Sequence, residues 1–123
     1  MRKKNILCTI CARKGSKGLK NKNILKLLGK PLIFHTISQA KKIKLISKIV
    51  ISTNSKKILN LAKNKVDFCI RRPEKLSNDR SSKIDAIKHA LLASEKNFKI
   101  NFDFIIDLDV TSPLRKKRDI INA

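Results

Sequence analysis

Apolar runs of strand length alternate along the chain with longer segments in which apolar residues recur at helical spacing. The runs predict four strands, at residues 5–12, 48–54, 67–72 and 102–109. Most positions within each run are apolar, so both faces of each strand would be buried. Strands of this kind are typical of a parallel sheet with helices on both faces, and we therefore expect an α/β, Rossmann-like fold with a mostly parallel sheet.

Three segments between these strands have the spacing of amphipathic helices. The first covers residues 31–44 and begins with Pro31, which suits the first turn because the N–H at that position has no helical partner. Ser55 is placed to cap a second helix, and Ser82 precedes a third. The expected apolar faces are Ile33, Ile37 and Ala40 in the first helix, Ile58, Leu61 and Ala62 in the second, and Ile84, Ile87 and Leu91 in the third.

The 123-residue chain corresponds to about one domain, and its hydrophobic content of 41% supports a globular fold. No apolar stretch approaches the length of a membrane span and the first residues lack the layout of a signal peptide, so we expect a cytoplasmic protein that does not insert in membranes. Four parallel strands are few for a sheet that buries both faces, and after them only a turn and the beginning of a helix at residues 117–123 follow. We therefore expect residues 1–123 to be the first part of a longer domain, truncated here.

A formal net charge of +21 is the largest departure from an average protein, and such an excess often indicates nucleic acid or an anionic membrane as a partner. The cations comprise 23 Lys and 7 Arg spread along the whole chain, and no Trp or Tyr is present to stack on bases. We interpret most of the excess as solvated surface and do not expect nucleic acid to be the main partner. A non-enzymatic, basic nucleic-acid-binding protein stays an alternative function.

Cys8 and Cys11 have the C-x-x-C spacing that can indicate redox chemistry or a metal site. Both lie within the first predicted strand, where residues three apart point to opposite faces of the sheet. Cys69 is the third cysteine, so no second pair exists to complete a four-thiolate zinc site. We expect the pair to be small, buried core residues.

The segment at residues 13–23, "RKGSKGLKNKN", follows the first predicted strand directly. In parallel sheets ligands bind at the carboxyl ends of the strands, which is where this loop would lie. Glycines such as Gly15 let backbone N–H groups approach phosphate oxygens without a Cβ in the way. Arg13 can place two donors on one phosphate, and Lys17 and Lys22 add point charges. The loop is a candidate triphosphate cradle, and a basic loop with incidental glycines is the alternative.

The stretch "ICARKGSKGLKNKNI" resembles the A-R-G-G-S-K-G-[IVL]-x-x-K-N loop of the acylneuraminate cytidylyltransferases, the CMP-sugar synthetases for nine-carbon acidic sugars. Lys14 stands where glycine is commoner in that family. Later blocks are similar to the family's in order and spacing: "LLGKPLIFHTI", "VISTN", "RRPEKLSNDRSS" and "LDVTSPLR". The resemblance runs from about Ile6 to the end of the chain and covers the amino-terminal half to two-thirds of such an enzyme. It implies a fold of the nucleotide-diphospho-sugar transferase type.

The resemblance also implies which residues bind CTP. Arg13, Lys17 and Lys22 would hold the phosphates and act in catalysis, with Lys22 stabilising the transition state. The nucleotide-binding residues that it implies are Arg13, Gly15, Ser16, Lys17, Lys22, Asn23, Arg72, Ser81 and Ser82. Lys83, next in the chain, stands where relatives have serine.

For the sugar acid, the resemblance implies binding by Asp109, Thr111, Ser112 and Arg115. Asp109 replaces the family's usual glutamine, which exchanges an amide that donates and accepts for a carboxylate that only accepts. This block and "NDR" resemble the subgroup associated with legionaminic acid. Asp107 and Asp109 are spaced to lie on one strand face, where they could help to hold Mg²⁺ or interact only locally.

The implied reaction is attack of the sugar's anomeric hydroxyl on the α-phosphorus of CTP, giving CMP-sugar and pyrophosphate, with Mg²⁺ as cofactor and a homodimer as the full-length form. Principal metal carboxylates and much of the dimer contact would lie beyond residue 123, so we expect the 123-residue chain alone to be inactive or impaired. The alternative within this fold is a nucleotidyltransferase for another sugar, such as the eight-carbon KDO.

Overall fold

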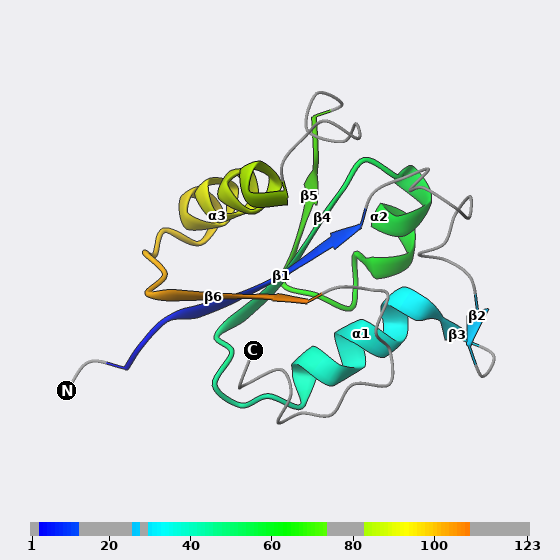
Figure 1. The fold of residues 1–123 in the computed structure, drawn as a ribbon, viewed down its shortest axis with the longest axis horizontal. Helices are drawn as coiled ribbons and strands as arrows, with labels where there is room; N and C mark the ends of the chain where they lie inside the picture. Colours follow the sequence, from blue (N-terminus) through cyan, green and yellow to red (C-terminus); the bar gives the residue numbers. More distant parts are fainter. Residues whose placement is uncertain (1–2, 13–25, 28–29, 74–82, 109–123) are drawn as a thin grey trace.

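A four-stranded parallel sheet is the centre of the fold in the computed structural model, which describes residues 3–12, 26–27, 30–73 and 83–108. The strands are β1 (Ile6–Ala12), β4 (Lys48–Thr53), β5 (Phe68–Arg71) and β6 (Phe104–Leu108). They stand in the order β5-β4-β1-β6 (Figure 1). All four predicted strands are confirmed, each within two residues of its expected ends.

The strand order reverses between β1 and β6. From β1 the chain crosses to β4 and on to β5 at one edge, and it then returns across the sheet to β6 on the other side of β1. In open parallel sheets, ligands bind outside the carboxyl ends of the strands at such a reversal. The carboxyl ends of β1 and β6 are therefore where the topology favours a binding site.

In the part of the chain that the structure describes, three helices cover the sheet, and a short antiparallel pair precedes the first of them. The helices are α1 (Leu32–Lys41), α2 (Lys56–Ala62) and α3 (Lys83–Phe98), and the short strands are β2 (Lys26–Leu27) and β3 (Lys30–Pro31). The Ser55 hydroxyl oxygen accepts the Ile58 N–H at 3.3 Å, so the predicted cap of the second helix is confirmed. Within the described residues, no helix is both long and apolar enough to cross a membrane.

The first predicted helix is confirmed but is shorter than expected, because it begins one residue later and ends three residues earlier. Pro31 belongs to β3, where it pairs with Lys26, and α1 begins one residue later. At the other end, the N–H groups of Lys42 and Ile43 bond to the carbonyl groups three residues back, at 3.2 and 3.1 Å. Such tight bonds turn the chain out of the helix, so α1 ends at Lys41.

One core fills the space between the sheet and the helices α1 and α2. Alternate residues of β1 point to this side, among them Cys8 and Ile10, which are fully buried. Ile33 and Ile37 of α1 pack against them, as their helical spacing predicted. In α2 the expectation holds for Ile58 and Ala62 but was wrong for Leu61, which is exposed.

A second core lies on the opposite face of the sheet, under α3. It contains Leu7, Val50, Ile70 and Ala90, with the rings of Phe68 and Phe98 in edge-to-face contact 5.9 Å apart. The predicted apolar face of this helix was partly wrong, because Ile84 is 64% exposed and the buried residues are Ala86, Ala90 and Ser94. Small side chains let a helix lie close to a sheet, and the Ser94 hydroxyl bonds within the helix to the Ala90 carbonyl at 2.7 Å. Helices therefore cover both faces, as predicted.

Candidate functional site

On the face under α3, the sheet changes from apolar to polar toward the carboxyl ends of its strands. Leu7 and Val50, nearer the amino ends, belong to the second core. The next inward positions are polar, with Thr9 opposite Asp107 and Cys11 opposite Ser52 in the strand register. Together with Arg72 after β5 and Lys83 at the start of α3, these residues form what we call the carboxyl-edge cluster: Thr9, Cys11, Ser52, Arg72, Lys83 and Asp107.

Arg72 is the buried cation of the carboxyl-edge cluster. Its side chain is only 6% exposed, and two of its nitrogens donate to Ser52: Nε to Oγ at 3.2 Å and Nη2 to the backbone oxygen at 3.1 Å. The Arg72 N–H bonds to the Thr53 carbonyl at 2.8 Å, so the backbone is fixed as well. Two bonds from one planar group to one residue set the orientation of the guanidinium.

Asp107 is the carboxylate of this cluster, and both of its oxygens are engaged. Oδ1 accepts the Thr9 hydroxyl at 2.7 Å, and Oδ2 lies 2.9 Å from the ammonium nitrogen of Lys83. The charge of Asp107 also acts on the nearby Cys11 thiol. Asp107 is thus held by neighbours from β1 and from α3.

The Cys11 thiol stays protonated at neutral pH. Burial is the main cause that raises its pKa from 9.0 to about 12, and the charge of Asp107 adds to the effect, while Arg72 and Lys83 oppose it. A thiol in this state is a poor nucleophile and metal ligand. Cys8 and Cys11 lie on opposite faces of the sheet and neither is in a disulfide. The prediction of a buried core residue is confirmed for Cys8 but was wrong for Cys11, which is only partly buried and lies in the polar cluster.

The described residues alone do not form a magnesium site. Among them, no group of three or more His, Cys, Asp or Glu side chains lies close enough to hold a metal ion. The carboxylate oxygens of Asp107, one of the two candidate ligands from the sequence, already bind the Thr9 hydroxyl and the Lys83 ammonium group. Asp109, the other candidate, lies outside the described residues.

Of the site residues predicted from sequence, the structure describes Arg72 and Asp107. The charges of both affect the pKa of the Cys11 thiol, so the two side chains lie at the same edge of the sheet. Those outside the described residues are Arg13, Gly15, Ser16, Lys17, Lys22, Asn23, Ser81, Ser82, Asp109, Thr111, Ser112 and Arg115. Their attachment points are described: Ala12 ends β1, Lys83 begins α3 and Leu108 ends β6. Since the four strands of the main sheet are parallel, β1, β5 and β6 all end at the same edge of it.

Sequence reasoning did not assign a role to Thr9, Cys11 or Ser52 at this edge. The signal was present, because polar side chains interrupt apolar strands at alternate positions and so share one face. Lys83 was noted as a departure from serine, but its partner, 24 positions away in the chain, could not be read from spacing.

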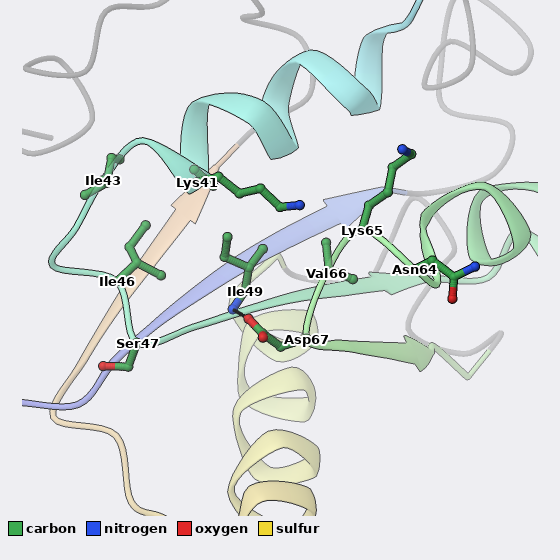
Figure 2. A pocket seen from close by; sticks show the side chains of 10 residues that line it. Lys41, Ile43, Ile46, Ser47, Ile49, Asn64, Lys65, Val66 and Asp67 are labelled. Atoms are coloured by element: carbon green, nitrogen blue, oxygen red, sulfur yellow. Dashed lines mark hydrogen bonds between the residues drawn. The ribbon is translucent and has the colours of Figure 1, made fainter.

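A hollow of about 400 Å³ lies at the opposite edge of the sheet, near the beginnings of β4 and β5 (Figure 2). Its walls are mixed, with apolar residues such as Ile43, Ile49 and Val66 beside polar and charged ones such as Lys65 and Asp67. Asp67 at its margin accepts the Ile49 N–H at 2.7 Å, which ties the two strands together. The hollow is thus separated from the carboxyl-edge cluster by the length of the strands.

Comparisons with known proteins point to one family. The family model described as "Cytidylyltransferase" matches residues 7–123. "Post-translational flagellin modification protein B" of Campylobacter coli is 50% identical over 119 residues, which is 96% of this chain and 51% of the relative. "CMP-N,N'-diacetyllegionaminic acid synthase" of Campylobacter jejuni is 48% identical over 109 residues, 88% of this chain and 46% of the relative. The chain spans about half the length of these relatives.

The fold also matches solved structures. The CMP:2-keto-3-deoxy-manno-octonic acid synthetase complexed with CTP superposes with a TM-score of 0.77 at 23% identity, over 96% of this chain and 45% of that one. At this identity the likeness bears on the fold alone. It agrees with the nucleotide-diphospho-sugar transferase type expected from the sequence.

Proposed function

The chain belongs to the cytidylyltransferase family, and from that membership we propose that the protein transfers a cytidylyl group from CTP to a nine-carbon 2-keto sugar acid. The family match over residues 7–123 is the observation that carries this proposal. Residues 1–123 would supply the nucleotide-binding part of the enzyme. The polar cluster at the strand-order reversal supports this assignment, because such an edge is where parallel sheets bind nucleotides.

The triphosphate of CTP is held, in this proposal, by the basic loop that follows β1. Arg13, Lys17 and Lys22 neutralise the phosphates and the charge that develops on the departing pyrophosphate. Asn23, Gly15 and Ser16 of the same loop complete the cradle. A single cation about 4 Å from a phosphate contributes about 4 kcal/mol at an effective dielectric constant near 20, so two or three suffice.

Arg72, Ser81 and Ser82 bind the rest of the nucleotide from the segment between β5 and α3. The fixed guanidinium of Arg72 supports this role, because an oriented donor loses little freedom when a ligand arrives. One edge of the Arg72 guanidinium donates its hydrogen bonds to Ser52, and its positive charge lies at the carboxyl ends of the strands.

The acceptor substrate is proposed to be an acidic nine-carbon sugar of the sialic or legionaminic type. One relative named above is a diacetyllegionaminic acid synthase, and its 48% identity with this chain supports this class. Asp109, Thr111, Ser112 and Arg115 would contact the sugar, with Arg115 suited to its carboxylate.

The chemistry is one displacement at the α-phosphorus. The anomeric hydroxyl oxygen forms the new P–O bond, the bond to the β-phosphate oxygen breaks, pyrophosphate leaves, and the hydroxyl proton passes to solvent. No covalent enzyme intermediate is needed, which is consistent with the protonated Cys11 thiol. Positioning and charge neutralisation supply most of the rate enhancement.

Mg²⁺, a homodimer and a cytoplasmic location belong to the same proposal. When bound, Mg²⁺ would neutralise phosphate oxygens, and its protein ligands would include residues outside the described part of the chain. Removal of metal with EDTA should abolish turnover, and added Mg²⁺ should restore it. Light scattering of the purified protein tests the dimer.

The decisive test offers the protein each of the four ribonucleoside triphosphates with a sialic acid, a legionaminic acid or KDO. Pyrophosphate release and the CMP-sugar product are measured. The proposal expects turnover with CTP and a nine-carbon acid. Turnover with KDO alone would favour the eight-carbon alternative, and turnover with another nucleotide would refute the assignment of CTP.

A further inference from the structure

One ion pair joins the beginning of α3 to the last described strand. The Lys83 ammonium nitrogen lies 2.9 Å from Oδ2 of Asp107, although the two residues come from opposite sides of the strand-order reversal. The Lys83 side chain is 55% exposed and that of Asp107 is 16% exposed. Lys83 is therefore a half-exposed side chain, whereas Asp107 is mostly buried on the surface of the sheet.

Asp107 is the fixed end of this contact. The Thr9 hydroxyl holds Oδ1 at 2.7 Å. This donor comes from β1, the strand that pairs with β6. Because Asp107 lies within a paired strand and would lose this bond if it shifted, the ion pair fixes the position of Lys83 and not the reverse.

The two ends of the ion pair adjoin the two segments that the proposed function uses. Lys83 directly follows Ser81 and Ser82, which are proposed to bind the nucleotide. Asp107 lies two residues before Asp109, which is proposed to contact the sugar. The last described range begins at Lys83 and ends at Leu108, so both segments lie next to the ion pair in the chain.

We propose that Lys83 is a positioning residue: its ion pair with Asp107 holds the first turn of α3, which directly follows the proposed nucleotide-binding residues in the chain, beside β6. This inference rests on the proposed function and adds a residue that the family resemblance does not assign. The gain is a preorganised nucleotide site, since the start of α3 is held in place before the ligand arrives.

Two variants test the ion pair, and one matched variant controls for the loss of a surface charge. Lys83→Met removes the ammonium and keeps the length of the side chain, and Asp107→Asn removes the opposite charge. Lys88→Met is the control, because Lys88 is an exposed lysine of the same helix. Lys83→Arg, which can re-form the pair, tests for rescue.

The first measurement is hydrogen exchange of the amides in the second turn of α3, which bond to carbonyl groups of the first turn, without any nucleotide. Lys83→Met and Asp107→Asn should each speed this exchange several-fold, and Lys88→Met should not. Equal exchange in all of the variants overturns the proposal, whatever the substrate of the enzyme is.

The second measurement is the dissociation constant for CTP, by calorimetry on the protein. Lys83→Met and Asp107→Asn should each raise this dissociation constant about threefold to tenfold. The dissociation constant of the double variant should not exceed that of the single variant that binds CTP less tightly. Lys83→Arg should restore the original value. A smaller folded fraction would lower the stoichiometry and leave the dissociation constant unchanged.

Asp107→Asn separates positioning from direct contact. If Lys83 itself bound a phosphate, loss of Asp107 would free it and leave CTP binding equal or tighter, which overturns the proposal. If the unchanged protein does not prefer CTP over other nucleotides, the proposed function fails, while the exchange measurement still decides whether the ion pair holds α3.

Discussion

Arg72 and Ser52 form a two-point contact at the carboxyl edge of the sheet, with Nε 3.2 Å from the Ser52 hydroxyl and Nη2 3.1 Å from its backbone oxygen. Both residues are buried, so water does not compete for these bonds. The contact converts a flexible side chain into a directed donor, and it is the described feature that most directly supports nucleotide binding at this edge.

Replacing Arg72 by lysine should weaken CTP binding about tenfold or more. Lysine keeps the charge but cannot make both bonds to Ser52, so the cation would no longer be oriented. Hydrogen bonds that involve a charged group contribute about 1.5–3 kcal/mol, which corresponds to this loss. Calorimetric titration with CTP measures the effect.

Arg71→Lys is the matched control for Arg72. Arg71 is the neighbouring residue in β5, is exposed, and lies on the other side of the strand. An equal loss of affinity in the two variants would show that general charge near the edge, and not the oriented guanidinium, attracts the nucleotide.

Above pH 9 the raised pKa of Cys11 should make the stability of the protein fall. In the unfolded chain the thiol ionises near 9.0, whereas in the folded protein it ionises near 12. Between these values the unfolded state has lost a proton that the folded state keeps, so the free energy of unfolding decreases by up to about 1.4 kcal/mol per pH unit. Below pH 9 the contribution is present in full.

Urea unfolding at pH 8, 9 and 10 measures this effect against Cys11→Ser, which has no titrating thiol. The stability advantage of the unchanged protein over this variant should shrink as the pH rises. Cys69→Ser is the comparison, because burial raises the pKa of Cys69 without a contribution from Asp107. A constant difference across the three pH values would contradict the environment described for Cys11.

Enlarging Ala90 should destabilise the protein, since this residue is fully buried where α3 meets the sheet. Ala90→Leu adds three carbon atoms to a filled space, and overpacking of this kind costs about 1–3 kcal/mol. Leu92→Ala, on the exposed side of the same helix, should change the free energy of unfolding by less than about 0.5 kcal/mol. If the two effects were reversed, the face assigned to α3 would be wrong.

Removal of the Ser55 cap should cost about 0.5–2 kcal/mol of the free energy of unfolding. The Ser55 hydroxyl satisfies the Ile58 N–H, one of the amides that the first turn of α2 leaves unpaired. Ser55→Ala loses this bond, whereas Ser55→Asp can restore it with a carboxylate. Thermal unfolding of the two variants should therefore rank Asp above Ala.

Local pattern was sufficient for the strands and for the face of α1, and it was right for α2 except at Leu61. The four apolar runs became strands, and Ser55 capped α2 because this cap depends on a contact with a residue only three positions along the chain. The face of α3 was misjudged at Ile84, since spacing alone does not distinguish a helix that packs through alanines from one that packs through large side chains.

The candidate site was harder to predict because its contacts join distant parts of the chain. Arg72 was found through a resemblance of motif, but its Ser52 partner is 20 positions away. The engagement of Asp107 by Lys83 depends on where α3 lies over the sheet, and no sequence period encodes that position.

The hydrogen bond between Thr9 and Asp107 spans 98 positions of the chain. The second strand that pairs with β1 is therefore β6, which is synthesised last among the strands of the sheet. During synthesis the ribosome would have released β1, β4 and β5 well before β6, leaving one side of the earliest strand open to other chains. Closing so long a loop is slow relative to local contacts, which makes the docking of β6 a natural late step of folding. Docking of β6 would then both cover the open side of β1, which protects it from aggregation, and complete the proposed ligand-binding edge.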